Sequence, residues 1–161
     1  MSTEETKKYF DIEKEKHFDF FIPLYKEKNW IVLKDNINCG YPISWDVNLE
    51  IIKGKNILVD EKVRIGNYND FLVEILQDIN SVKTGWLYGR KDYILYGIWD
   101  NIQNIQPKDL YIINSNKLKE YIFNLNGFTT TCISKKGWGN TWNIVLDWNK
   151  LIEKQIAKKL I

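Results

Sequence analysis

Hydrophobic and polar positions follow two different periods along the chain. From Tyr9 to Leu24, apolar residues recur at near-helical spacing among charges, which predicts an amphipathic helix that Pro23 ends or bends. After Trp30 the pattern changes to short apolar or alternating runs between turn-rich loops, which is typical of strands. The predicted strands are 45–52, 56–65, 71–76, 92–99, 110–113, 129–134 and 142–146. The first two of them form a hairpin around a short lysine-containing turn.

Two more helices are predicted in the last third of the chain. Ser115 is a suitable N-cap for a helix that Gly127 ends. Asp147 is a suitable N-cap for a last helix, whose apolar residues keep near-helical spacing at positions 148, 151, 152, 156 and 160. This order of elements predicts an α/β (α+β) fold with a mixed central sheet flanked by helices, in which a later strand is reached by a crossover.

The composition indicates a single domain over residues 1–161. A chain of 161 residues with 44% hydrophobic content can form one core, while residues 1–8 carry no apolar residue after Met1 and are expected to be disordered. No segment is apolar enough to span a membrane or to act as a signal peptide. We therefore expect a cytoplasmic protein without a membrane partner. The excess of lysine over arginine, 21 to 2, indicates an AT-rich organism, virus or mobile element.

The chemistry available to this chain is limited by its few cysteines and histidines. Cys39 and Cys132 lie far apart without a metal-binding spacing, and His17 is the single histidine. A zinc site of Cys and His and most nucleophilic triads are thereby excluded, and the net charge of +2 decides nothing about partners. Any enzymatic chemistry is expected to use carboxylates, lysines and a hard metal ion.

Charged residues interrupt the second strand of the hairpin. Alternation places Asp60 and Lys62 on one face, about 7 Å apart, where both could contact one phosphate and its metal ion. Folding the hairpin brings Asp46 to within one to three residues of the position opposite Asp60. Two aspartates and a lysine would then converge, although a solvated strand face gives the same pattern.

A further carboxylate, Glu74, interrupts a strand that reads as buried on both faces. Burying a carboxylate lowers the free energy of unfolding by roughly several kcal/mol unless the group is paired or bound to a cation. The predicted site therefore includes Glu74 as a metal or pairing group. The alternative is a sheet edge from which Glu74 points to water.

The sequence Asp46, then Asp60-Glu61-Lys62, resembles the signature of the PD-(D/E)xK nuclease superfamily, which has a restriction-endonuclease-like fold. The stretch Val59 to Tyr96 is similar to small phage and mobile-element members, in which the strand after the DxK sequence carries a Glu. The resemblance covers roughly residues 10–125, so residues 127–161 would be a C-terminal extension of the core. The Pro of the signature is replaced by Trp45.

The resemblance implies a Mg²⁺-dependent endonuclease that acts on DNA, with Mn²⁺ as a substitute. The catalytic residues it implies are Asp46, Asp60, Lys62 and Glu74. Lys62 would orient the attacking water, and Glu13 or Glu15 on the first helix is a weaker candidate by analogy. The implied metal ligands are Asp46, Asp60, the carbonyl of Glu61, and Glu74.

Aromatic and basic residues in the segment before the strand 92–99 suggest contact with the substrate. The candidates are Trp86, Tyr88, Arg90 and Lys91 in this segment, together with Arg64 on the predicted strand 56–65. The alternative is that the aromatic residues pack in the core. Double-strand cleavage by so small a domain would need a homodimer. A non-catalytic DNA-binding or carbohydrate-binding module is the competing hypothesis, and a restriction, junction-resolving or repair role stays open, as does RNA as a substrate.

Overall fold

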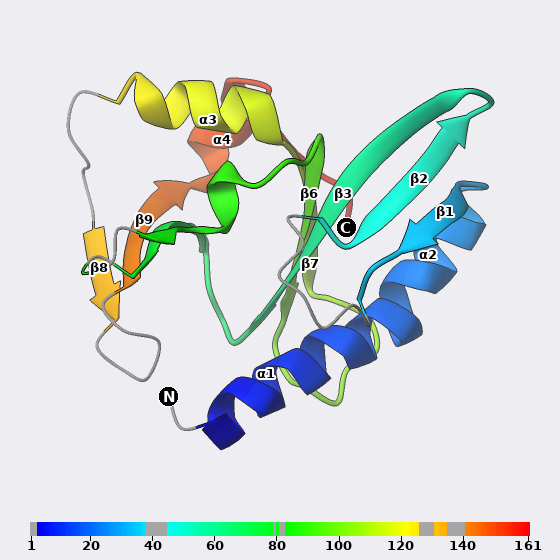
Figure 1. Ribbon diagram of the computed structural model, residues 1–161, viewed down its shortest axis with the longest axis horizontal. Helices are drawn as coiled ribbons and strands as arrows, with labels where there is room; N and C mark the ends of the chain where they lie inside the picture. The colour runs from blue at the N-terminus through cyan, green and yellow to red at the C-terminus, as the bar shows by residue number, and fades with distance from the viewer. Residues whose placement is uncertain (1–2, 38–44, 79, 81–82, 126–130, 135–140) are drawn as a thin grey trace.

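The computed structural model describes residues 3–37, 45–78, 80, 83–125, 131–134 and 141–161, and these residues form a mixed α+β fold (Figure 1). The chain begins with consecutive helical segments: α1 (Thr3–Lys16), the π-helical turn η1 (His17–Phe21) and α2 (Ile22–Glu27). The helical region is longer at both ends than predicted. It continues past Pro23 because this residue lies in the first turn of α2, where a missing N–H interrupts no bond of that helix.

Six strands form a mixed sheet, in the order β1-β2-β3-β6-β7-β10. They are β1 (Ile31–Asp35), β2 (Val47–Ile52), β3 (Lys55–Ile65), β6 (Tyr93–Trp99), β7 (Asp109–Asn114) and β10 (Ala157–Lys159). The strands β3 and β6 are parallel and the other neighbours are antiparallel. The predicted mixed sheet with a crossover is therefore confirmed.

A second, antiparallel sheet has the order β5-β4-β9-β8. Its strands are β5 (Lys83–Thr84), β4 (Asp70–Asp78), β9 (Thr141–Asp147) and β8 (Thr131–Ser134). The short helix η2 (Trp86–Tyr88) follows β5, and α3 (Ser115–Phe123) and α4 (Trp148–Glu153) lie nearby (Figure 1). The strand patterns did not indicate this second sheet, because alternation reports the faces of a strand but not its neighbours.

The six-stranded sheet separates two hydrophobic cores. On one face, η1 and α2 pack against β2, β3 and alternate residues of β6, including Leu95 and Trp99. On the other face, Ile94, Tyr96 and Ile98 of β6 pack against the second sheet, α3 and α4. The strand β6 is therefore buried on both faces, as its continuous apolar sequence predicts.

The C-terminal region differs most from the prediction. The N-cap of α3 is Asn114 and not Ser115, since the Asn114 side chain accepts the Lys117 N–H at 3.0 Å. Asp147 caps α4 as predicted, but the helix ends at Glu153, and Gln155 adopts a left-handed φ of 55°. Residues 157–159 then form the edge strand β10 instead of a further helical turn. Residues 127–161, expected as an extension, supply strands to both sheets.

Among the described residues, no helix is long and apolar enough to cross a membrane.

Candidate active site

The β2–β3 hairpin brings Asp46 to the position opposite Asp60. Val47 pairs with Val59, and the Asp46 N–H, just before β2, donates to the Val59 carbonyl at 2.8 Å. The Asp46 carboxylate turns back onto β3, where Oδ2 accepts the Glu61 N–H at 2.6 Å. The convergence predicted from the hairpin is therefore present, and a register shift between Glu50 and Ile52, next to the turn, sets the pairing that places Asp46 opposite Asp60.

Asp60 is held between two lysines. Lys62, two residues along the same face of β3, donates to Oδ1 at 2.8 Å. Lys91, in the segment before β6, donates to Oδ2. The Lys62 side chain is 23% exposed, whereas that of Lys91 is 1% exposed. Lys62 can therefore reach a molecule that binds from solvent, while Lys91 neutralises Asp60 from inside the protein.

Trp86 forms one wall of this cluster. Its carbonyl accepts a hydrogen bond from Lys91 Nζ at 2.5 Å. The Nζ atoms of Lys62 and Lys91 lie 5.5 and 5.2 Å from the centre of the indole ring, which is the range of cation–π contacts. Trp86 is thus part of the cluster, but its ring is occupied by the two ammonium groups. Lys91 is buried, so the structure places it as a support for Asp60 and not on a substrate surface.

The first helix contributes Glu13 to the same cluster. Glu13 is half-buried, and the charges of Lys62 and Asp60 act on its carboxylate. Glu15 instead points outward and pairs with Lys16 at 3.2 Å. Of the two glutamates considered on this helix, Glu13 is the one that faces the predicted site.

The carboxyl groups of the cluster differ in how readily they ionise. Burial raises the pKa of Asp46 to about 8, and the charges of Asp60 and Glu61 add to this effect against the opposing charge of Lys62. Burial also raises the pKa of Glu13, with the same carboxylates contributing. For Asp60, burial alone would raise the pKa, but the two adjacent lysines lower it below its usual value. Asp60 is thus ionised, whereas burial disfavours the ionised forms of Asp46 and Glu13.

Glu74 lies on β4, in the second sheet. The strand is buried on one face only, and Glu74 is half-buried on the other, so the expectation of burial on both faces is wrong. Glu74 Oε1 accepts the Trp86 N–H at 3.3 Å, and the Trp86 carbonyl binds Lys91. Glu74 is therefore linked to Asp60 through the backbone of Trp86 and the ammonium group of Lys91.

The other candidate substrate contacts lie outside the cluster. Arg64 donates to Asp70 Oδ1 at 2.6 Å and stacks on Tyr68, with its guanidinium carbon 3.7 Å from the ring centre. These contacts hold the turn between β3 and β4. Tyr88 and Arg90 are exposed at the end of η2 and in the segment that follows.

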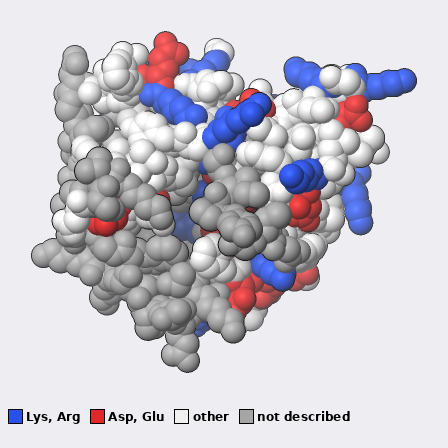
Figure 2. All heavy atoms as spheres, in the orientation of Figure 1, with Lys and Arg blue, Asp and Glu red and all other residues white. Residues whose placement is uncertain are grey.

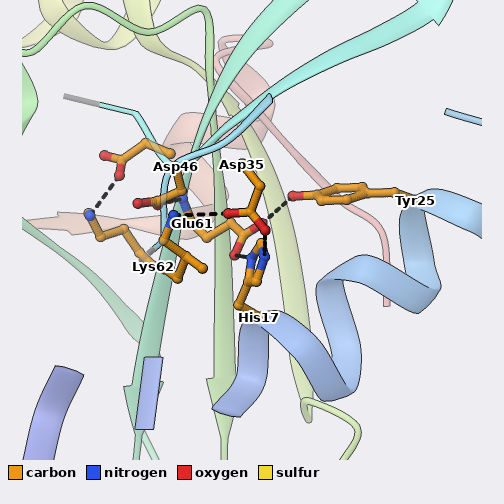
Figure 3. A network of polar contacts seen from close by, with 8 residues as sticks. His17, Tyr25, Asp35, Asp46, Glu61 and Lys62 are labelled. Carbon is orange, nitrogen blue, oxygen red and sulfur yellow. Dashed lines mark hydrogen bonds and ion pairs between the residues drawn. The ribbon is translucent and has the colours of Figure 1, made fainter. Parts of the chain in front are cut away.

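A polar network that the sequence did not indicate lies behind β3 (Figure 3). Glu61 points to the opposite face from Lys62, where its carboxylate accepts the Tyr25 hydroxyl at 2.6 Å and lies 2.7 Å from His17 Nδ1. His17 Nε2 is 3.0 Å from Asp35 Oδ2. Burial alone would lower the pKa of His17, but the two carboxylates outweigh it and raise the pKa to about 8. The sequence signal for this network is the eight-residue spacing of His17 and Tyr25, which places two residues on the same face of a helix.

No group of three or more His, Cys, Asp or Glu side chains in the described residues is arranged as a ready metal cage. Comparison with known protein families, with curated proteins and with solved structures gives no match for the chain.

Proposed function

We propose that the chain is a metal-dependent nuclease of the PD-(D/E)xK type that hydrolyses phosphodiester bonds in DNA. The observation that carries the proposal is the meeting of Asp46, Asp60 and Lys62 where β2 and β3 pair. An ionised carboxylate, a second carboxyl group whose pKa burial raises to about 8 and a partly exposed ammonium group lie together there. These are the groups that metal-assisted phosphodiester hydrolysis uses.

The chemistry of the donor set fits Mg²⁺. This ion is commonly bound through one or two carboxylates, and keeps water or phosphate oxygens as its other ligands, so a cage of three protein carboxylates is not required. Asp46, Asp60 and the Glu61 carbonyl would hold it, with Glu13 as the nearest further carboxylate. A bound divalent cation would supply a counter-charge, lower the pKa of a water molecule and neutralise the scissile phosphate.

Lys62 has the substrate-facing role in this proposal. Its ammonium group is fixed by Asp60 and by the indole of Trp86, yet part of its side chain is open to solvent. Nζ would donate a hydrogen bond to the attacking water or to a phosphate oxygen as negative charge develops there. Lys91 keeps Asp60 ionised and in place during the reaction.

The surface of the hairpin favours a polyanionic substrate. Lys53 in the turn between β2 and β3 and Lys55 at the start of β3 are both exposed. Blue side chains project from this end of the hairpin in Figure 2. Such charges attract nucleic acid through its phosphates without regard to sequence. Cutting both strands of a duplex would take two copies of the chain, because each copy carries one such cluster among its described residues.

The proposal is tested by titrating Mn²⁺ into the wild type, Asp60→Asn and Lys62→Ala by calorimetry. The same proteins are then incubated with supercoiled and branched DNA in Mg²⁺. Asp109→Asn is the matched control, because this aspartate pairs with Lys159 at the far edge of the six-stranded sheet.

We expect the wild type and the control to bind Mn²⁺ and cleave DNA. Asp60→Asn should lose both properties, and Lys62→Ala should lose cleavage while remaining folded. Full cleavage by both site variants, or neither metal binding nor cleavage by the wild type, would exclude the proposed function. The preferred DNA would identify the subclass of nuclease.

A further inference from the structure

Glu61 connects the two faces of β3. Its side chain points to the face covered by η1 and α2, and both carboxylate oxygens are engaged there: Oε1 by the Tyr25 hydroxyl at 2.6 Å and Oε2 by His17 Nδ1 at 2.7 Å. Its backbone N–H donates to Asp46 Oδ2 at 2.6 Å. One residue is thus fixed by the helices from behind and fixes a carboxylate of the candidate active site in front.

The two helical residues that contact the Glu61 carboxylate are fully buried. His17 and Tyr25 are both 0% exposed, and Glu61 is 5% exposed. His17 belongs to the π-helical turn η1, a geometry that is frequent at functional sites. Asp35 at the end of β1 holds the other ring nitrogen at 3.0 Å. Ordinary packing of α2 on the sheet would need only the apolar residues that surround this network.

We propose that His17 and Tyr25 are positioning residues for the metal-binding end of the site: by clamping Glu61, they hold the peptide N–H that orients Asp46. Figure 3 shows Tyr25 and His17 converging on Glu61 and Asp35 behind His17, with Lys62 projecting from the other side of β3. The inference rests on the proposed function for the identity of the ligand. It extends that function to residues that touch neither metal nor substrate, as outer-shell partners in metal sites do.

Tyr25→Phe is the variant that tests the clamp, since it removes one hydroxyl and leaves the ring. Tyr96→Phe is the matched control, because Tyr96 is also buried and its hydroxyl is bonded to Arg64, away from Asp46. Mn²⁺ affinity is measured by calorimetry, and the exchange rate of the Glu61 amide by NMR without metal. Thermal unfolding of each variant accounts for any general loss of stability.

Tyr25→Phe should weaken Mn²⁺ binding about 10-fold, the lower end of the usual effect of an outer-shell partner, and should speed exchange of the Glu61 amide. Tyr96→Phe should change neither at comparable stability. Unchanged Mn²⁺ affinity and unchanged exchange in a folded Tyr25→Phe protein would overturn the inference and leave the nuclease proposal intact.

The two proposals fail in different ways. If the wild type binds no Mn²⁺, the proposed function fails, and the inference is then decided by the exchange rate of the Glu61 amide alone. If Tyr25→Phe does not fold, Asp35→Ala replaces it, because the Asp35 side chain is 30% exposed and can be removed at lower cost. Asp35→Ala should also weaken Mn²⁺ binding. An unchanged Mn²⁺ affinity would count against the proposal that His17 and Tyr25 hold Glu61 in place.

Discussion

Replacing Lys91 by methionine should destabilise the protein through Asp60. Both side chains are almost fully buried, at 1% and 5% exposure, and methionine keeps the length of lysine without its charge. Removing one partner of a buried ion pair costs roughly 3–5 kcal/mol, because the other charge is left without compensation. Lys62 still binds Asp60 at 2.8 Å, so we expect the lower value, about 3 kcal/mol. For a chain of this size, that is a fall in Tm of about 6–12 °C.

A double-mutant cycle with Asp60→Asn separates the charge effect from packing. The double variant lacks both charges, so it should be more stable than the sum of the single variants predicts, by about 1–3 kcal/mol. Urea titrations give the free energy of unfolding of the wild type, of each single variant and of the double variant. The exposed pair of Lys108 and Asp100 supplies a control cycle, in which we expect a coupling below about 1 kcal/mol. Additive costs for the buried pair, within about 0.5 kcal/mol, would refute the role given to Lys91.

Two further predictions concern pH and backbone packing. The folded pKa of His17, about 8, lies above its ordinary value of 6.5, so protonated His17 contributes stability that is complete below pH 6.5 and is lost as pH rises through 8. Urea titrations of wild type and His17→Gln without added metal should therefore show a stability difference that shrinks by about 2 kcal/mol over that range; a constant difference would contradict the network. Gly85→Ala should destabilise by about 1–3 kcal/mol in thermal unfolding. Its Cβ would lie 2.3 Å from the backbone oxygen of Glu74, and a wild-type Tm would show that the two segments are not in contact.

The parts of the site that could be predicted are those that local geometry determines. The position of Asp60 beside Lys62 follows from the two-residue period of a strand, and a hairpin with a short turn brings Asp46 near them. These inferences need no knowledge of which elements pack together. The mixed sheet and the α+β class follow from the order of elements in the same way. The register shift between Glu50 and Ile52, which places Asp46 directly opposite Asp60, could not be predicted.

The remaining features depend on tertiary packing, which the sequence pattern does not contain. The roles of His17 and Tyr25 require that the first helices cover the back of β3 with a π-helical turn between them. Lys91 could be separated from surface lysines only by knowing that it is buried beside Asp60. The apolar spacing after Asp147 fits a long helix equally well, but Gln155 ends the helix and β7 pairs with the segment that follows.

The π-helical turn has a consequence for how this chain tolerates changes in length. A π turn contains one residue more than an α-helical turn, so deleting one residue within η1 would restore a regular helix. The regular helix α1 has no such extra residue, so deleting one residue between Glu13 and η1 would rotate everything before it by about 100° relative to α2. Glu13 would leave the cluster while Tyr25 kept its place on Glu61. A deletion in α1 after Glu13 is therefore expected to be selected against even where every side chain in the candidate site is retained, whereas the π turn can lose its extra residue.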